Sequence, residues 1–211
     1  MMQDLFTEAR EDLDDGAVLM RGFAVDAAAA LLSDIAQVSA LAPFRHLVTP
    51  GGFRMSVAMT NCGDFGWVSD RRGYRYDPID PESGHPWPPM PVSFIDLAGR
   101  AAHAAGYAGF HADVCLINCY LPGTRLTLHQ DRDEGDFTQP IVSISLGLPA
   151  AFLWGGKART DKTRRYALHH GDVVVWGGLS RLNFHGIAPL KDGNHPIVGA
   201  RRFNLTFRRA R

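Results

Sequence analysis

A His-x-Asp pair, His129 and Asp131, is the part of this chain best suited to chemistry. It stands at the end of the second of two β-prone runs, 114–121 and 125–129, which a Pro-Gly turn separates. Side chains alternate faces along an extended strand, so His129 and Asp131 would project to the same side. One imidazole beside one carboxylate supplies two thirds of a 2-His-1-carboxylate iron site. The third ligand must be a later histidine that the fold brings to this pair.

His185 is the histidine that best completes the set. A second His-x-Asp, at residues 170–172, competes with the first, but it directly precedes an apolar run, where Gly-Asp suits a turn entering a buried strand. Several strands separate Asp131 from His185, and a sheet folded back on itself can return such a distant residue. We therefore predict that His129, Asp131 and His185 bind iron and that residues 170–172 are structural. A lone His185 would more simply be a histidine with one hydrogen bond.

The C-terminal run 202–208 alternates between an apolar and a polar face. The apolar face is Phe203, Leu205 and Phe207. The polar face is Arg202, Asn204, Thr206 and Arg208. A solvent-exposed polar face is the simple interpretation, whereas an inward face would offer two guanidiniums to a dicarboxylate. Iron with three protein ligands keeps three open positions, enough for a 2-oxo acid and O₂.

The pattern around these residues predicts a mainly β chain with flanking helices. Helices are expected from an N-cap at Asp26 to about residue 41 and over 93–105. Further strands are expected at 17–23, Met55–Thr60, 141–147, 150–154, 165–169 and 172–177. Short strands between glycine and proline turns suggest a sandwich or jelly roll.

Residues 48–91 differ from the rest because glycines and prolines interrupt them and aromatic side chains are frequent. A long irregular segment of this kind is often a lid over a binding site. The alternative, that the rings simply pack the segment against the body, remains open.

Composition excludes several classes of protein. The 211 residues are 45% hydrophobic and carry 22 basic and 22 acidic side chains, which argues against binding nucleic acid through bulk charge. The charges are nevertheless segregated, acidic over 4–15 and basic over 157–165 and 201–211. Three cysteines without a CxxC pair favour a reducing compartment. Neither a signal peptide nor a membrane span is apparent, so we expect a cytoplasmic protein.

Several motifs in register resemble the AlkB family of Fe(II)/2-oxoglutarate dioxygenases, which repair alkylated nucleobases. They are Asn118-x-Tyr120-x-Pro122-Gly123, His129-x-Asp131-x-Asp133-Glu134, Ser143-Ile144-Ser145-Leu146-Gly147, His185-Gly186 and Arg202-x-Asn204-Leu205-Thr206-Phe207-Arg208. The stretch Thr49-Pro50-Gly51-Gly52 and the run 55–63 are typical of the bacterial members. An ordered set of motifs over most of the chain is more specific than any one of them.

The resemblance implies a fold and a set of roles. The fold is a single domain, 1–211, with an N-terminal extension (about 1–44), a nucleotide-recognition lid (about 45–90) and a double-stranded β-helix, or jelly-roll, core (about 113–211). Fe(II) would be bound by His129, Asp131 and His185. The co-substrate 2-oxoglutarate would be bound by Asn118, Tyr120, Arg202, Asn204 and Arg208. The substrate would be bound by Trp67, Tyr74, Asp133 and Arg159.

The activity implied is oxidative demethylation of bases such as 1-methyladenine and 3-methylcytosine in single- or double-stranded DNA, with RNA as a further substrate. Trp67 would stack the damaged base against the ring of His129, and Asp133 would meet the edge of the base. These lesions are cationic, which suits a carboxylate at Asp133. Oxidation would consume 2-oxoglutarate and O₂ and release succinate and formaldehyde, and we expect the enzyme to be a monomer.

Two departures and two alternatives accompany the resemblance. Phe203 replaces the usual tyrosine, and Cys119 replaces a larger residue, which alternation directs away from the metal. A dioxygenase acting on an RNA modification, a protein or a small molecule would keep the metal and co-substrate residues. A non-enzymatic jelly-roll module would have no use for two inward arginines.

Overall fold

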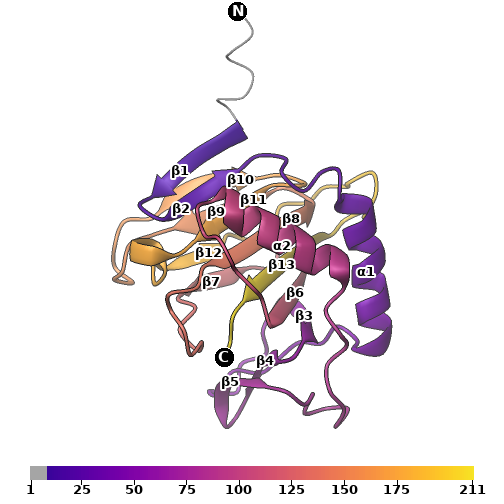
Figure 1. The fold of residues 1–211 in the computed structure, drawn as a ribbon. Coiled ribbons are helices and arrows are strands. Elements are labelled where there is room, and N and C mark those ends of the chain that lie inside the picture. The colour runs from indigo at the N-terminus through magenta and orange to yellow at the C-terminus, as the bar shows by residue number, and fades with distance from the viewer. Residues whose placement is uncertain (1–8) are drawn as a thin grey trace, which may run out of the picture.

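The computed structural model describes residues 9–211 as two large antiparallel β-sheets, a separate two-stranded hairpin and two α-helices packed on the larger sheet (Figure 1). The part of the acidic run at residues 4–8 lies outside the described residues. In spatial order, the larger sheet comprises β1 (Arg10–Asp14), β2 (Ala17–Met20), β11 (Val173–Trp176), β8 (Ile141–Gly147), β13 (Arg202–Arg208), β6 (Val114–Tyr120) and β3 (Ala58–Gly63). The smaller sheet comprises β10 (Arg164–Leu168), β9 (Ala150–Trp154), β12 (His185–Ile187) and β7 (Leu126–His129).

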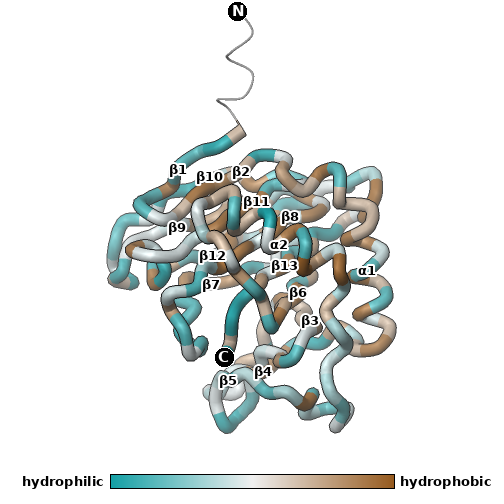
Figure 2. Tube along the Cα trace, in the orientation of Figure 1, coloured by the Kyte–Doolittle hydropathy of each residue, from teal (hydrophilic) through white to brown (hydrophobic). Residues whose placement is uncertain are grey.

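The helices α1 (Ala28–Leu41) and α2 (Val92–Ala104) pack on one face of the larger sheet. The stripe expected on α1 is buried there, at Leu31, Ile35 and Val38. β13 contributes Phe203, Leu205 and Phe207 to the same core. Figure 2 shows hydrophobic segments along the central strands and hydrophilic segments in many of the connections. The alternation of β13 therefore separates a helix-facing apolar side from a polar side.

A second core fills the space between the two sheets. Its large members include Tyr120, Ile141, Phe152, Trp154 and Trp176. Burying a side chain of this size contributes about 1.5–3 kcal/mol, so this layer holds the sheets face to face. The sandwich is the jelly-roll core with flanking helices that the strand pattern and the family resemblance predicted. Within the described residues, no helix is long and apolar enough to cross a membrane.

Three predicted boundaries are wrong. Asp26 does not cap α1, because a run of turns occupies 21–27 and Ala27 takes the N-cap position without a side-chain hydrogen bond. The strand expected at 17–23 ends at Met20, because the chain turns there: Gly22 adopts a positive φ of 63° and donates its N–H to Asp172. The strand expected at Met55–Thr60 begins later, as β3, because pairing with β6 sets its length.

The segment expected to be an irregular lid contains more regular structure than predicted. β3 joins the larger sheet, and a separate hairpin follows, β4 (Gly66–Asp70) paired with β5 (Gly73–Asp77). Isolated bridges at Arg45–Met59 and Val48–Arg54 order the preceding loop. The hairpin lies at the edge of the molecule below β3 and β6 (Figure 1). The sequence did not predict this hairpin, because Gly66 and Gly73 suggested interruptions between elements and not the first residues of strands.

Candidate metal and co-substrate site

Three side chains predicted as metal ligands come together at one end of the smaller sheet. His129 and His185 are direct cross-strand partners on β7 and β12. The Nε2 atom of His129 lies 3.7 Å from Asp131 Oδ1, and that of His185 lies 3.6 Å from Asp131 Oδ2. One ligand atom from each residue lies within 4.8 Å of the other two. Two imidazoles and one carboxylate on one face fit the ligand set of a non-haem Fe(II) oxygenase.

The backbone orients both imidazoles toward this cluster. His129 Nδ1 lies 2.9 Å from the carbonyl oxygen of Thr127, and His185 Nδ1 lies 3.1 Å from that of Asn183. A carbonyl oxygen can only accept, so each Nδ1 carries the hydrogen and each Nε2 is left with its lone pair. Histidines that bind metals are commonly fixed in this way through the second ring nitrogen.

Electrostatics favour the protonation states that a metal requires. Burial opposes ionisation of Asp131, yet Arg208 and the two histidines hold the pKa of its carboxyl well below the usual range. Burial, with His129 alongside, lowers the pKa of His185 to about 3. Asp131 is therefore a carboxylate and His185 a neutral imidazole near neutral pH, which are the forms that coordinate divalent metals.

A cavity of about 1000 Å³ extends from this cluster across the polar face of β13. The inward interpretation of that face is therefore correct, because Arg202, Asn204, Thr206 and Arg208 all line the cavity. The neighbouring strand β6 adds Asn118 and Tyr120, which register opposite Asn204 and Arg202. The predicted co-substrate residues thus converge from two paired strands.

The arginines carry hydrogen-bonding capacity that the protein leaves unused. Arg202 is 1% exposed and donates from Nη2 to Ser145 Oγ at 3.0 Å, while its Nε and Nη1 have no partner among the described residues. Burial lowers the pKa of Arg202. The hydroxyl of Tyr120 and Nη1 of Arg208 are similarly buried and unpaired. Buried donors rarely remain unsatisfied, so these atoms fit a ligand that bears a carboxylate at each end.

The predicted substrate residues line the mouth of the same cavity. Trp67 on β4 and Tyr74 on β5 stack with ring centroids 5.5 Å apart and planes at 12°. Trp67 Nε1 donates to Asp133 Oδ2 at 2.9 Å, so Asp133 holds the ring as well as facing the cavity. Arg159 also lines the cavity and lies over the ring of Phe184 at 5.9 Å.

Both departures face away from the metal. Phe203 packs beside Phe44 in the helix-side core at 5.9 Å, and Cys119 is packed against that same core. The competing motif at residues 170–172 is structural, as expected. Its Asp172 carboxylate accepts the N–H groups of Gly22 and His169.

Sequence reasoning missed two residues that contact the site, Tyr76 and Arg181. Arg181 Nη1 donates to the carbonyl oxygen of Asp131 at 2.7 Å, and its Nη2 pairs with Glu134 at 3.1 Å. Tyr76 donates to the same Glu134 from the lid hairpin. Neither has a local signal, because each reaches the site through a contact distant in sequence.

Comparison with known proteins agrees with this geometry. A family model described as 2OG-Fe(II) oxygenase superfamily matches residues 16–208. The chain is 58% identical to the alpha-ketoglutarate-dependent dioxygenase AlkB of Escherichia coli (strain K12), over 99% of this chain and 98% of that protein. This chain belongs to the AlkB family of 2OG-Fe(II) oxygenases. It is an Fe(II)/2-oxoglutarate-dependent dioxygenase, with O₂ as the second co-substrate.

Two further relatives extend the comparison. The solved structure of OsALKBH1 superimposes with a TM-score of 0.84 at 29% identity, covering 95% of this chain and 99% of that one. A protein of Arabidopsis thaliana named DNA N(6)-methyladenine demethylase ALKBH1D is 37% identical over 147 residues, which is 57% of this chain and 33% of that protein. The likeness to OsALKBH1 therefore covers nearly the whole fold.

Proposed function

We propose that this AlkB-family enzyme oxidatively demethylates nucleobases alkylated at a ring nitrogen, such as 1-methyladenine and 3-methylcytosine, in DNA. The observation that carries the proposal is that a histidine of the metal cluster, His129, and the aromatic pair of the lid, Trp67 and Tyr74, line one cavity. A flat ring held at the mouth of this cavity would place its substituents toward the cluster.

In this proposal His129, Asp131 and His185 hold Fe(II), which supplies oxidation by O₂ coupled to the decarboxylation of 2-oxoglutarate. The unused donors of Arg202 and Tyr120 would bind one carboxylate of 2-oxoglutarate and the free Nη1 of Arg208 the other, because each is buried and unpaired. Asn118 and Asn204 would add hydrogen bonds. They already contact each other, Asn118 Nδ2 to Asn204 Oδ1 at 3.2 Å, which fixes both amides.

The overall reaction balances without a further reductant. 2-Oxoglutarate is oxidised to succinate and CO₂, one oxygen atom of O₂ enters succinate, and the other enters the methyl C–H bond. In a cationic lesion the resulting N–CH₂OH group loses its hydroxyl proton to solvent as the C–N bond breaks. The bonding pair returns to the ring nitrogen, so formaldehyde and the neutral repaired base are released. The role of the protein residues is to hold the methyl carbon near the cluster and exclude water from it.

Substrate selection would rest on the lid. Enzymes that act on a base take it out of the stack and hold it against aromatic faces. Trp67 would give up its contact with Tyr74 and stack the base against His129. Asp133, which holds the Trp67 indole, would also meet the base edge and favour lesions that carry a positive charge.

The polynucleotide would lie across the mouth of the cavity. Arg54, Arg125, Arg132 and Arg159 line it, which suits contact with phosphates even though the net charge is zero. We further propose that the enzyme acts as a monomer, as one domain over 1–211 with its lid at about 45–90, on single- or double-stranded DNA and on RNA. The three free cysteines suit the cytoplasm.

A turnover comparison across methylated oligonucleotides tests this function. Single strands carrying 1-methyladenine, 3-methylcytosine or the neutral lesion 1-methylguanine are incubated with Fe(II) and 2-oxoglutarate, and succinate and formaldehyde are measured. We expect formaldehyde from both cationic lesions, less from the neutral one and none from the unmethylated strand. Iron-loaded enzyme that makes succinate but releases no formaldehyde from any lesion contradicts the proposal. DNA and RNA versions of each strand compare the two substrates.

A further inference from the structure

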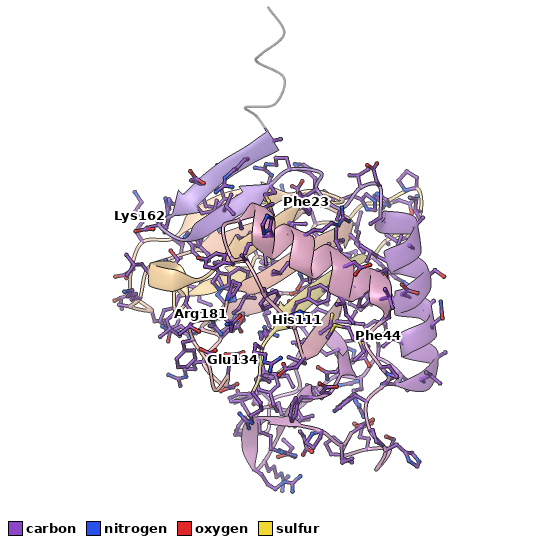
Figure 3. The ribbon with its side chains drawn as sticks, viewed as in Figure 1. Phe23, Phe44, His111, Glu134, Lys162 and Arg181 are labelled. Carbon is purple, nitrogen blue, oxygen red and sulfur yellow. The ribbon has the colours of Figure 1, made fainter. Side chains whose placement is uncertain are left out.

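A continuous set of buried polar contacts joins the lid hairpin to the metal cluster. The Tyr76 hydroxyl on β5 donates to Glu134 Oε1 at 2.5 Å. The same oxygen lies 3.3 Å from Arg208 Nε, and Arg208 Nη2 lies 3.0 Å from Asp131 Oδ2. Arg181 connects Glu134 to Asp131 a second time, because it donates hydrogen bonds to Glu134 Oε2 and to the carbonyl oxygen of Asp131. Figure 3 labels Glu134 and Arg181, which lie close together on the side of the molecule that carries β7.

These contacts are too deeply buried to be incidental surface ion pairs. The side chains of Glu134, Arg181 and Arg208 are 1%, 3% and 6% exposed. With Asp131 they make two carboxylates and two guanidiniums. A buried set of charges costs desolvation free energy that an apolar cluster of the same volume would avoid. The arrangement is therefore better explained by the geometry that it imposes than by stability.

Arg208 is the residue whose geometry is constrained most. Its Nη2 donates to Asp131 Oδ2, its Nε lies 3.3 Å from Glu134 Oε1 as an ion pair without a hydrogen bond, and its Nη1 remains for the co-substrate carboxylate. The charge of Glu134 thus attracts one side of the guanidinium, and the hydrogen bond from Tyr76 fixes where Glu134 Oε1 lies. Tyr76 is also the direct cross-strand partner of Trp67. One hydroxyl therefore connects the strand pair that carries the aromatic lid to the arginine of the co-substrate site.

We infer that Tyr76, Glu134 and Arg181 are positioning residues that orient Arg208 and Asp131, and that the Tyr76–Glu134 contact couples lid closure to 2-oxoglutarate binding. The inference rests on the proposed co-substrate role of Arg208. Coupling of this kind is reciprocal, so 2-oxoglutarate stabilises the closed hairpin to the extent that the closed hairpin tightens 2-oxoglutarate binding.

The substitution Tyr76→Phe tests the coupling because it removes the hydroxyl and keeps the ring. Tyr107→Phe is the matched control. It removes the hydrogen bond from a partly buried tyrosine hydroxyl to the Gly16 carbonyl oxygen, and Tyr107 does not line the cavity. The dissociation constant of 2-oxoglutarate is measured without oxygen from the visible absorption that it develops with Fe(II). We expect Tyr76→Phe to weaken binding about fivefold to tenfold and Tyr107→Phe to leave it within about twofold.

Hydrogen exchange of the amides at 66–77 provides a second readout that does not depend on turnover. In the unmodified enzyme, 2-oxoglutarate should slow their exchange, and in Tyr76→Phe it should not. Glu134→Gln keeps the shape of the side chain and removes its charge. It should also weaken 2-oxoglutarate binding and reduce the slowing of exchange at 66–77. This variant tests the inference if Tyr76→Phe does not fold. The inference would be overturned if Tyr76→Phe kept the 2-oxoglutarate affinity and the ligand-dependent slowing of the unmodified enzyme. It would also be overturned if Tyr107→Phe changed them equally. An unmodified enzyme that fails to bind 2-oxoglutarate would instead contradict the proposed function.

Discussion

The floor and the lid of the cavity hold their functional groups in opposite ways. We define the floor as the polar faces of β6 and β13 together with His129, Asp131 and His185. Its arginines are buried and its carboxylate is paired, so its geometry is largely set before any ligand arrives. We define the lid as hairpin β4–β5 with the loop 48–54. Its Tyr74 and Phe53 line the cavity but are 46% and 77% exposed.

The difference follows from what each region has to do. Oxidation of a C–H bond requires reacting groups fixed within fractions of an ångström, and paired central strands provide that rigidity. Recognition of an extruded base requires aromatic surfaces that can part and close again. In the proposed function Trp67 illustrates this requirement, because its ring now stacks on Tyr74 and would have to exchange that partner for a base. Substitutions in the two regions should therefore fail in different ways.

The largest effect is expected on the floor, from Asp131→Asn. The substitution removes the anionic ligand and leaves Arg208 without its carboxylate partner, so succinate and formaldehyde should fall together by about 10³-fold, equivalent to roughly 4 kcal/mol. Turnover and bound iron are measured side by side. Asp136→Asn is the control, because that carboxylate is not among the residues that line the cavity and accepts hydrogen bonds from Thr138 in the nearby turn. Near-normal turnover of Asp131→Asn would remove Asp131 from the metal set.

Arg202→Met should affect the co-substrate alone. Loss of a buried charged donor should raise KM for 2-oxoglutarate about 10²-fold, or 2–3 kcal/mol, while KM for the oligonucleotide stays the same. Arg201→Met, at the exposed neighbouring position, is the matched variant. Steady-state kinetics with each substrate varied in turn separate the two constants. An equal rise in both would mean that floor and lid do not act separately.

Trp67→Ala, on the lid, should affect the oligonucleotide and leave the co-substrate unaffected. Stacking of a base on an aromatic ring contributes about 1–3 kcal/mol, so KM for a methylated oligonucleotide should rise about tenfold with 2-oxoglutarate binding unchanged. Trp67→Phe keeps a ring but loses the hydrogen bond to Asp133. Its KM for the oligonucleotide should therefore lie between those of the unmodified enzyme and Trp67→Ala. The lid loses its proposed role if Trp67→Ala binds the oligonucleotide normally.

The smallest effect concerns the turn that supports the floor. His170 Nδ1 accepts the N–H of Gly147, which lies opposite Arg202. Burial, together with His195, lowers the pKa of His170 below its usual value of 6.5. His170 therefore binds a proton more readily in the unfolded chain than in the folded protein. The stability that neutral His170 contributes is lost as pH falls below about 6.5. Denaturant unfolding at pH 7.5 and 5.0 measures the free energy of unfolding at each pH. Between these two values His170→Asn should lose less stability than the unmodified enzyme. An equal or larger loss in His170→Asn would exclude His170 as the cause.

The floor could be predicted from the sequence far better than the lid. Alternation along 202–208 separated the apolar and polar faces of β13, and the spacing of His129 and Asp131 identified two ligands directly. His185 was predicted only indirectly, as the downstream histidine that best completes the set, because β12 is only three residues long and carries no periodic signal. Hairpin β4–β5 and the contacts of Tyr76 and Arg181 were missed, since glycines obscured the strands and pairing across the fold determines those contacts.

The ratio of formaldehyde to succinate in Trp67→Ala tests the separation of floor and lid most directly. With a strand carrying 1-methyladenine, the unmodified enzyme should release about one formaldehyde per succinate, as the balanced reaction requires. Trp67→Ala should keep the slow succinate formation that occurs without oligonucleotide and release clearly less formaldehyde per succinate when the strand is present. If Trp67→Ala instead loses both products in parallel and the ratio stays near one, the lid takes part in the oxidation itself, which would contradict the separation of floor and lid.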